Sequence, residues 1–368
     1  MRKYFAPGRI NLIGEHIDYN GGKVLPAAIS IGITATVGEF MEGFISLSSS
    51  SHSKTIEKKN SDEIQYNQAN DWLNYPLGVI NHLQQKGFNL PSISIHYEST
   101  LPESSGLSSS AAIEVLTLYL LLEEIKAKIS RPEIAVWCKE VENKFIGIQC
   151  GIMDQFIIAN AKKGHAMLLD CSKLGHEFIP ADFGNFALVL LNTKKPRSLI
   201  HSKYNERKAE CEAALLSINQ KNSSGSIQHL CTANIQHIEL IKDESLKKRT
   251  RHVITENERV NQAVAALKSH NMIAFGKLLT ESHQSLKHDY EVSGVELDAM
   301  AEAAIQTKGC IGARMTGAGF GGCAIALVEI EAVDFFEENV LKQYKEKTGI
   351  EGEIHSCNIA EGVSLLSK

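Results

Sequence analysis

The chain has 368 residues, of which 43% are hydrophobic and 22% charged, and this composition is typical of a soluble globular protein. The chain is longer than chains that usually fold around a single hydrophobic core, so we predict two packed domains. The formal net charge of −5 argues against a surface that binds nucleic acids or anionic membranes, so we expect neither as a partner.

The chain carries no evident export signal or membrane anchor. Its first 16 residues reach Pro7 and Arg9 before any apolar run develops, so they lack the core of a signal peptide. The most apolar stretch, residues 111–125, is interrupted by Glu114 and Glu123 and falls short of the roughly 20 apolar residues of a spanning helix. The eight cysteines are scattered without a C-x-x-C pair, which favours reduced thiols. We therefore predict a cytoplasmic protein.

Strands and helices alternate in the first half of the chain. Residues 31–40 and 93–97 are predicted strands, and the polar segment 46–63 between them is interpreted as a loop that contains one short polar strand. Further along, Ser130 stands two residues before Pro132, which predicts a helix that begins there with a serine cap.

The second half reads as a block of helices between strands. Its predicted elements are a strand at 186–192, a helix near 203–217, a polar loop at 217–226, helices around 255–287 and 293–308, and strands at 312–315, 323–329 and about 353–359. The pattern predicts an α+β fold with mixed order in both halves. A boundary near 180–190 divides the chain into expected domains at 1–182 and 183–368.

The segment from Arg9 to Asn20 concentrates charged and polar side chains beside three glycines, Gly14, Gly21 and Gly22. Glycines at that density allow tight turns and the close approach of a ligand. Carboxylates beside such turns suit a ligand covered in hydroxyl groups, such as a sugar. An ordinary solvated turn between two strands is the alternative, and a metal site on the Glu-His-x-Asp stretch has less support because the spacing differs from H-E-x-x-H.

A serine-rich turn, residues 102–110, leads into the apolar helix at 111–125. The N-terminus of a helix presents free N–H groups and a positive dipole end, and serine hydroxyls there can bind phosphate oxygens or a Mg²⁺ held by phosphates. The segment differs from a G-x-x-x-x-G-K-[ST] loop, so a nucleotide would be bound by another architecture. Serines that simply cap a helix are the alternative.

Two further segments carry candidate site residues. Glu142 lies on the helix predicted after Ser130, and Asp154 follows Gly151 between apolar neighbours, where it could act as a base or an ion-pair partner. A helix-start aspartate favoured by the dipole is the alternative. The run at 316–323 holds four glycines before an apolar strand, which favours a backbone support for phosphate or the site over a dinucleotide fingerprint, with a plain hairpin as the alternative.

Together these motifs resemble the GHMP small-molecule kinases and, within them, the galactokinases, over nearly the whole chain. GRINLIGEHIDYNGGKVLP is similar to the galactokinase signature, GLSSSAA to the second family motif, CGIMDQF to the catalytic segment and TGAGFGGC to the third motif. The resemblance implies a two-domain fold of mixed sheets with helices packed on them and the active site in the cleft between the domains. It also implies ATP-dependent phosphorylation of galactose at C1, the first step of galactose catabolism, by a monomer that uses Mg²⁺.

The resemblance also implies roles for single residues. Arg9 and Asp154 would be catalytic, and whether Asp154 abstracts the hydroxyl proton or only orients it is left open. The sugar would be bound by Glu15, His16, Ile17, Asp18, Gly151 and Tyr204. ATP would be bound by Ser104, Ser105, Gly106, Leu107, Ser108, Ser109 and Ser110, with Trp72 near the adenine, and Mg²⁺ by Ser110 and Glu142.

The chain departs from the family pattern at two of these positions. Ser104 stands where the family usually has a glycine of G-A-G-L-S-S-S, and Ile17 replaces a usual threonine. The chain also starts almost at the first motif. Two alternatives remain: a kinase of galacturonate, arabinose or fucose, and a non-catalytic galactose and ATP sensor. A kinase of an acidic sugar should have an added basic group near the pocket. A sensor should have a damaged phosphate loop.

Overall fold

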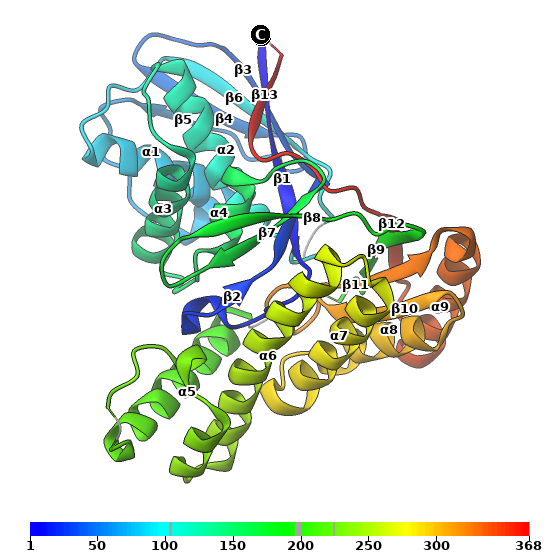
Figure 1. The fold of residues 1–368 in the computed structure, drawn as a ribbon. Coiled ribbons are helices and arrows are strands. Elements are labelled where there is room, and N and C mark those ends of the chain that lie inside the picture. The colour runs from blue at the N-terminus through cyan, green and yellow to red at the C-terminus, as the bar shows by residue number, and fades with distance from the viewer. Residues whose placement is uncertain (103–104, 196–199, 224, 368) are drawn as a thin grey trace.

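In the computed structural model, which describes residues 1–102, 105–195, 200–223 and 225–367, the strands form three sheets. The largest has the order β13-β1-β3-β6-β4-β5, and its neighbours are antiparallel except for the parallel pair β4–β6. The last strand of the chain pairs with the first, as Figure 1 shows. The strands of this sheet are β1 (Arg2–Asn11), β3 (Pro26–Glu39), β4 (Phe44–Ser49), β5 (Ile56–Lys59), β6 (Ile93–Ser99) and β13 (Ser364–Ser367).

Helices α2 and α4 pack on this sheet, and α1 and α3 pack on α2 (Figure 1). Helix α2 contacts β1 and β3 and is buried on most sides, because its apolar residues surround the helix instead of forming one stripe. Helix α3 begins as predicted, since the Ser130 hydroxyl accepts a hydrogen bond from the Glu133 N–H and Pro132 lies in the first turn. The bounds are α1 (Asn74–Gln85), α2 (Ser109–Glu124), α3 (Arg131–Val141) and α4 (Met153–Asn160).

The second half is built on a sheet with the order β10-β11-β9-β12. Helices α7 and α8 pack against β10, and the neighbours α5, α6 and α7 form a layer of long helices below the first half in Figure 1. The elements are β9 (Phe186–Asn192), β10 (Cys310–Met315), β11 (Cys323–Glu329), β12 (Glu353–Ser356), α5 (Ile200–Lys221), α6 (Glu244–Lys268), α7 (Met272–Ser285), α8 (Gly294–Gln306) and α9 (Val333–Thr348).

A small sheet, β2-β7-β8, links the two halves. Its strand β7 packs against β3 of the first half, and β8 packs against α6 of the second. The strands are β2 (Lys23–Val24), β7 (His165–Asp170) and β8 (His176–Pro180). Both halves thus combine helices with mostly antiparallel strands, which confirms the predicted α+β class. Because β13 returns to the first sheet, the proposed division after residue 182 leaves one strand of the second half in the first.

Short helical turns complete the chain and carry several residues of the site. Two of them continue α3 and α7 as wider π turns, and both end in a residue with positive φ, Gly147 (89°) and Glu291 (58°). The turns are η1 (Asp18–Asn20), η2 (Gln68–Leu73), η3 (Glu142–Ile146), η4 (Leu230–Thr232), η5 (Ile235–Leu240), η6 (Leu286–Tyr290) and η7 (Ile330–Ala332).

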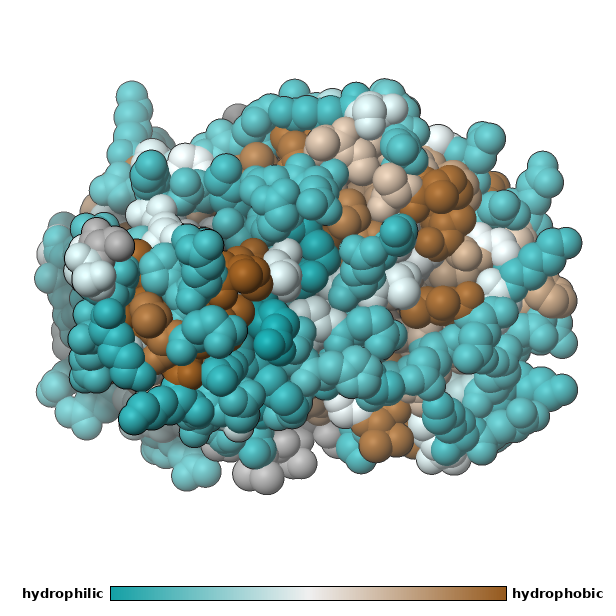
Figure 2. All heavy atoms as spheres, turned by 60° about the horizontal axis from the view of Figure 1, so that its bottom comes forward, coloured by the Kyte–Doolittle hydropathy of each residue, from teal (hydrophilic) through white to brown (hydrophobic). Residues whose placement is uncertain are grey.

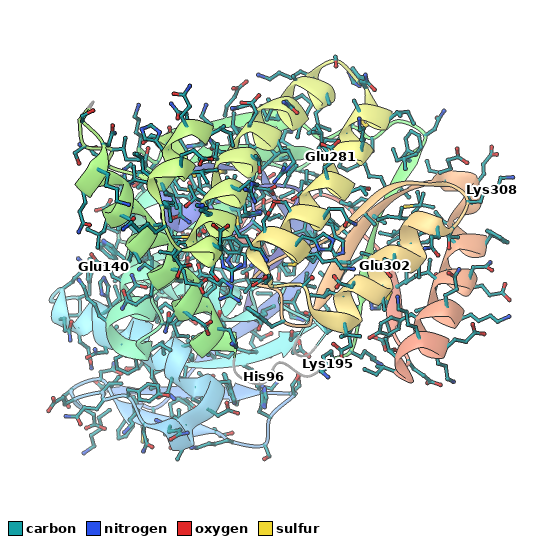
Figure 3. The ribbon with its side chains drawn as sticks, turned by 90° about the horizontal axis from the view of Figure 1, so that it is seen from below. His96, Glu140, Lys195, Glu281, Glu302 and Lys308 are labelled. Carbon is teal, nitrogen blue, oxygen red and sulfur yellow. The ribbon has the colours of Figure 1, made fainter. Side chains whose placement is uncertain are left out.

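Charged side chains cover the outer faces of the helices. Figure 3 shows Glu281 on α7 and Glu302 on α8 pointing away from the core, and Glu302 forms ion pairs with Lys287 and Lys347. The face in Figure 2 is mostly hydrophilic and has separate hydrophobic patches. Within the described part of the chain, no helix joins the length and the apolar character that crossing a bilayer requires.

The structure corrects three predicted boundaries. The loop predicted at 46–63 begins inside β4, because this strand pairs with the buried β6, while the short polar strand predicted within the loop is β5. Helix α5 continues to Lys221 and takes up half of the loop predicted at 217–226. The strand predicted to end near residue 359 stops at Ser356.

Candidate active site

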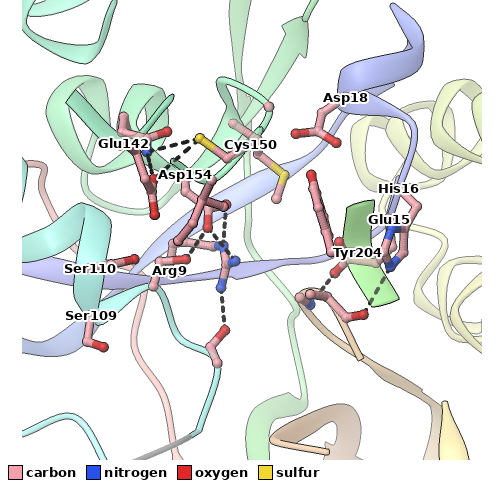
Figure 4. A pocket seen from close by; sticks show the side chains of 18 of the residues that line it. Arg9, Glu15, His16, Asp18, Ser109, Ser110, Glu142, Cys150, Asp154 and Tyr204 are labelled. Carbon is pink, nitrogen blue, oxygen red and sulfur yellow. Dashed lines mark hydrogen bonds and ion pairs between the residues drawn. The ribbon is translucent and has the colours of Figure 1, made fainter. Parts of the chain in front are cut away.

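A cavity of about 240 Å³ lies between the two halves of the chain. The first half contributes β1, the turn before η1, the serine-rich segment and the start of α4, and the second half contributes α5 and the turn between β10 and β11 (Figure 4). The predicted residues that line it are Arg9, Glu15, His16, Asp18, Ser105, Gly106, Ser108, Ser109, Ser110, Glu142, Gly151, Asp154 and Tyr204. Four motifs that are far apart in the sequence therefore meet at one cavity.

An arginine and an aspartate form the centre of this cavity. The guanidinium of Arg9 donates from Nε to Asp154 Oδ1 at 2.8 Å and from Nη2 to Oδ2 at 2.7 Å, a bidentate pair that fixes both side chains. Arg9 also donates from Nη1 to the carbonyl oxygen of Gly106, and the Ser108 hydroxyl donates to Asp154 Oδ2. Since a carboxylate oxygen accepts two hydrogen bonds, Asp154 Oδ1 can still accept one from a bound hydroxyl group.

The charge of Arg9 is maintained by its partners. Burial disfavours its guanidinium, but Asp154 and Glu15 outweigh burial and raise the pKa of Arg9. Arg9 is 4% exposed, whereas the side chain of Asp154 is 29% exposed and reaches the cavity. A fixed positive charge therefore lies beside a carboxylate that a substrate can contact.

The serine-rich segment brings a helix N-terminus to the same cavity. Ser108 precedes α2 in the left-handed region, with φ 62° and ψ 47°, and Ser109 and Ser110 form the first turn. Ser108 lies 8% exposed, and the backbone N–H of Arg9 donates to the carbonyl oxygen of Leu107, which ties this segment to β1. The free N–H groups and the dipole of α2 favour an anion here.

A buried carboxylate, Glu142, lies next to this helix start. It accepts a hydrogen bond from Gln155 Nε2 at 2.5 Å, and Cys150 Sγ lies 3.4 Å from it. Burial first, and then the charge of Asp154, raise the pKa of Glu142 to about 7. A cation at this position would relieve both effects.

The carboxylate of Glu15 is held by both halves. Its Oε2 accepts from Asn11 Nδ2 at 3.1 Å, and its Oε1 accepts from the backbone N–H of Gly317 at 2.6 Å. Arg314, which is fully buried, lies 3.7 Å behind it. Burial raises the pKa of Glu15, while Arg314 and Arg9 oppose that effect. The glycine-rich run at 316–323 is a turn between β10 and β11, and it supports the site through its backbone.

Asp18 packs directly against Gly151, and both line the cavity. A Cβ atom placed on Gly151 would lie 1.6 Å from Asp18 Oδ2, so the absence of a side chain at 151 leaves the room that this carboxylate occupies. Burial first, and then the charge of Asp154, raise the pKa of Asp18 to about 7. The ring of Tyr204 lies beside that of His16, with 5.6 Å between the centroids, and closes this end of the cavity.

A second cavity of about 400 Å³ adjoins the first, and both are lined by Ser109 and Ser110. Trp72 lies in this second cavity with its ring stacked on His52, with centroids 5.6 Å apart. Its buried Nε1 has no hydrogen-bond partner in the described chain, so the indole N–H is available to a ligand. The position is half-buried just before α1.

Two predicted residues, Ile17 and Leu107, do not line either cavity in the described structure. Ile17 is fully buried and packs on Gly22, and Leu107 is 1% exposed, so their side chains support the site from the core. Ser104 lies outside the described residues. Sequence reasoning missed Gln155 and Ala318, although both stand inside quoted motifs, because the motifs mark positions without showing which way a side chain points.

Three family models match the chain. The model described as the galactokinase galactose-binding signature matches residues 3–39, the GHMP kinases N terminal domain matches 74–162, and the GHMP kinases C terminal domain matches 263–346. The first of these contains Arg9, Glu15 and Asp18, and the second contains Asp154.

Known proteins resemble the chain over its whole length. It is 44% identical over 365 residues to the galactokinase of Staphylococcus carnosus, covering 98% of this chain and 94% of that protein. The galactokinase of Bacillus subtilis is 41% identical over 369 residues, at 100% and 95% coverage. The crystal structure of Lactococcus lactis galactokinase with galactose superposes with a TM-score of 0.94 at 40% identity, covering 99% and 95% of the two chains. A mevalonate kinase, at 22% identity, a TM-score of 0.69 and 97% and 98% coverage, shares the fold.

Proposed function

Because the chain belongs to the galactokinase family of the GHMP kinases, we propose that it transfers the γ-phosphoryl group of ATP to the C1 hydroxyl of galactose. The observation that carries this proposal is the bidentate Arg9–Asp154 pair in a cavity that also receives the N-terminus of α2. An acceptor hydroxyl and a phosphoryl group can meet at this pair.

Galactose would occupy the part of the cavity lined by carboxylates. Asp18 is half-buried in this part, and Glu15 is fixed by the backbone of Gly317. Carboxylate oxygens accept hydrogen bonds from sugar hydroxyls with defined directions, which suits recognition of one sugar. Tyr204, His16 and Gly151 would complete the enclosure.

Phosphoryl transfer depends mainly on positioning and on charge stabilisation. Asp154 would accept a hydrogen bond from the C1 hydroxyl and take or orient its proton. Arg9, held by Asp154 and by the Gly106 carbonyl, would stabilise the negative charge that develops on the transferred group. The chemistry thus needs no movement of either charged side chain.

ATP would bind across both cavities. Its phosphates would lie on the N-terminus of α2 at residues 105–110, and its adenine would lie near Trp72, whose indole N–H lacks a partner within the described chain. The shared lining of Ser109 and Ser110 supports a continuous path between the two cavities.

The residues fit a Mg²⁺ bound together with the nucleotide. Glu142 is buried, lies within hydrogen-bond reach of Ser110 and lines the same cavity, and oxygen atoms are the ligands that Mg²⁺ prefers. In the described chain no group of three or more His, Cys, Asp and Glu residues could hold a metal, so Ser110 and Glu142 would share the ion with phosphate oxygens. When bound, Mg²⁺ would neutralise charge on the phosphates.

The test is the release of ADP by the purified protein with ATP and Mg²⁺ across a panel of acceptors. The panel contains galactose, 2-deoxygalactose, glucose, arabinose, fucose, galacturonate and mevalonate. We expect turnover with galactose and its close analogues. Turnover confined to another acceptor would show that galactose is not the substrate. Binding of galactose and ATP without turnover would identify a sensor. The predicted cytoplasmic location, the monomer and the domains 1–182 and 183–368 belong to the same proposal.

A further inference from the structure

Five groups from both halves of the chain form one line of hydrogen bonds beside the sugar-binding residues. His16 Nδ1 lies 2.8 Å from the hydroxyl of Tyr19, and that hydroxyl lies 2.8 Å from the hydroxyl of Tyr290. The Tyr290 hydroxyl lies 3.1 Å from Cys211 Sγ. At the other end, His16 Nε2 lies 3.1 Å from the carbonyl oxygen of Ala318.

The direction of every bond in this line follows from its end at Ala318. A carbonyl oxygen can only accept, so His16 Nε2 carries a hydrogen and donates it. Burial and the nearby His252 lower the pKa of His16 to about 3, so its ring is neutral and Nδ1 accepts from Tyr19. The Tyr290 hydroxyl must then donate to Tyr19, and the thiol of Cys211 must donate to Tyr290.

Tyr290 is held rigidly although it does not line the cavity. It ends the π turn η6, is fully buried, and its ring lies 4.8 Å from that of His16 and 4.5 Å from that of His252, measured between centroids. Its carbonyl oxygen accepts a hydrogen bond from Arg207 Nε at 2.9 Å. The hydroxyl group of Tyr290 is therefore a fixed donor that the second half offers to the first.

The hydrogen bonds of this line support residues that belong to, or lie next to, the proposed sugar site. Tyr19 follows Asp18 in η1, and both nitrogens of His16 are already occupied, so neither can turn without breaking a bond in the line. Asp18 lines the cavity in direct contact with Gly151. We propose that Tyr19 and Tyr290 are positioning residues for galactose, in which Tyr290 acts through Tyr19 to hold the turn at 16–20, and with it Asp18, against the sugar. This inference rests on the proposed function.

The first experiment measures the KM for galactose and for ATP in Tyr19→Phe and Tyr290→Phe. Each change removes one hydroxyl and keeps the ring. We expect the KM for galactose to rise roughly three- to tenfold in each variant, the loss typical of one buried hydrogen bond, while the KM for ATP stays within about twofold. Tyr4→Phe is the matched control, because its buried hydroxyl donates to Glu124 far from the cavity and its loss should leave both constants unchanged.

The double variant separates positioning from mere stability. If Tyr290 acts through Tyr19, the KM for galactose in Tyr19→Phe/Tyr290→Phe should equal that of Tyr19→Phe alone instead of the product of the two effects. A multiplied effect would overturn the proposal, and so would a lowered melting temperature with an unchanged KM for galactose. A wild-type protein that does not phosphorylate galactose would instead overturn the proposed function.

A spectroscopic measurement on the protein itself does not depend on turnover. With ¹⁵N-labelled histidine, nuclear magnetic resonance should show His16 as the neutral tautomer with hydrogen on Nε2, assigned by comparison with His16→Gln. The Nδ1 resonance should move towards its unbonded position in Tyr19→Phe and remain in place in Tyr4→Phe. Hydrogen on Nδ1, or a doubly protonated ring at neutral pH, would overturn the directions derived above.

Discussion

Replacing Gly151 by alanine tests the sugar site through a single added methyl group. The Cβ atom would lie 1.6 Å from Asp18 Oδ2 and 2.4 Å from its Cγ, whereas ordinary contacts begin at 3.4 Å. The backbone at Gly151 has no positive φ, so strain in the main chain does not contribute. The carboxylate of Asp18 therefore has to move by about 1.8 Å to make room for the methyl group.

That movement exceeds the tolerance of a hydrogen bond to a sugar hydroxyl, which spans about 2.5–3.0 Å. A hydrogen bond to a charged group contributes roughly 1.5–3 kcal/mol, so we expect the KM for galactose to rise about ten- to hundredfold. The KM for ATP should change little, because the nearest atoms to the added methyl group all belong to Asp18. Initial rates at saturating ATP and Mg²⁺, with galactose varied, give the answer.

Gly175→Ala is the matched control for this experiment. Gly175 lies between β7 and β8, has no positive φ, and has open space around its added Cβ. The control should keep the wild-type KM for both substrates. A folded Gly151→Ala protein with an unchanged KM for galactose would refute the reasoning, since Asp18 would then not contact the sugar at its observed position.

Four further predictions address the chemistry, the metal, pH and stability. Asp154→Asn should lower turnover roughly 10²- to 10⁴-fold while ADP still binds in calorimetry, and normal turnover would remove Asp154 from the reaction. Glu142→Gln should weaken the binding of Mn²⁺ in the presence of ATP, followed by electron paramagnetic resonance, and equal affinity would contradict a metal-binding role. The pKa of Asp18 is raised to about 7, so this carboxylate loses its charge as the pH falls through that value. The affinity for galactose, measured by calorimetry, should therefore increase between about pH 6 and pH 8. The Asp18→Asn variant should lose this pH dependence. Gly276→Ala should destabilise the fold by roughly 1–3 kcal/mol, because the added Cβ would lie 2.3 Å from the Ile311 carbonyl oxygen. Thermal denaturation measures this loss, and an unchanged melting temperature would show that α7 can shift on β10.

Local sequence patterns predicted the parts of the fold that depend on neighbouring residues. The start of α3 follows from Ser130 and Pro132, because a cap needs only groups within one turn. The apolar α2 follows from its composition, since a helix that is hydrophobic on all sides has to be buried. The sequence predicts only part of the strand β4, because its serines are typical of a loop. The strand β6, with which it pairs, lies almost fifty positions away in the sequence.

The motifs also predicted most residues of the site, although by resemblance and without their geometry. Arg9 and Asp154 are 145 positions apart, and no local pattern indicates that their side chains form a bidentate pair. The same holds for Glu15 and Gly317, whose hydrogen bond joins the glycine-rich turn to the proposed sugar site. Ile17 stands inside a motif and yet points into the core, because a buried turn has an inner and an outer side.

The sequence by itself determined the α+β class, the family resemblance and the identity of most polar residues that line the cavity, because these depend on residue types and their order. Only the tertiary structure decided that Gly151 leaves room for Asp18, and that Tyr290, 271 positions from Tyr19, joins its hydroxyl to the sugar signature. The proposed role of Tyr290 arises because η6, the turn that continues α7, brings its hydroxyl within hydrogen-bonding distance of the Tyr19 hydroxyl.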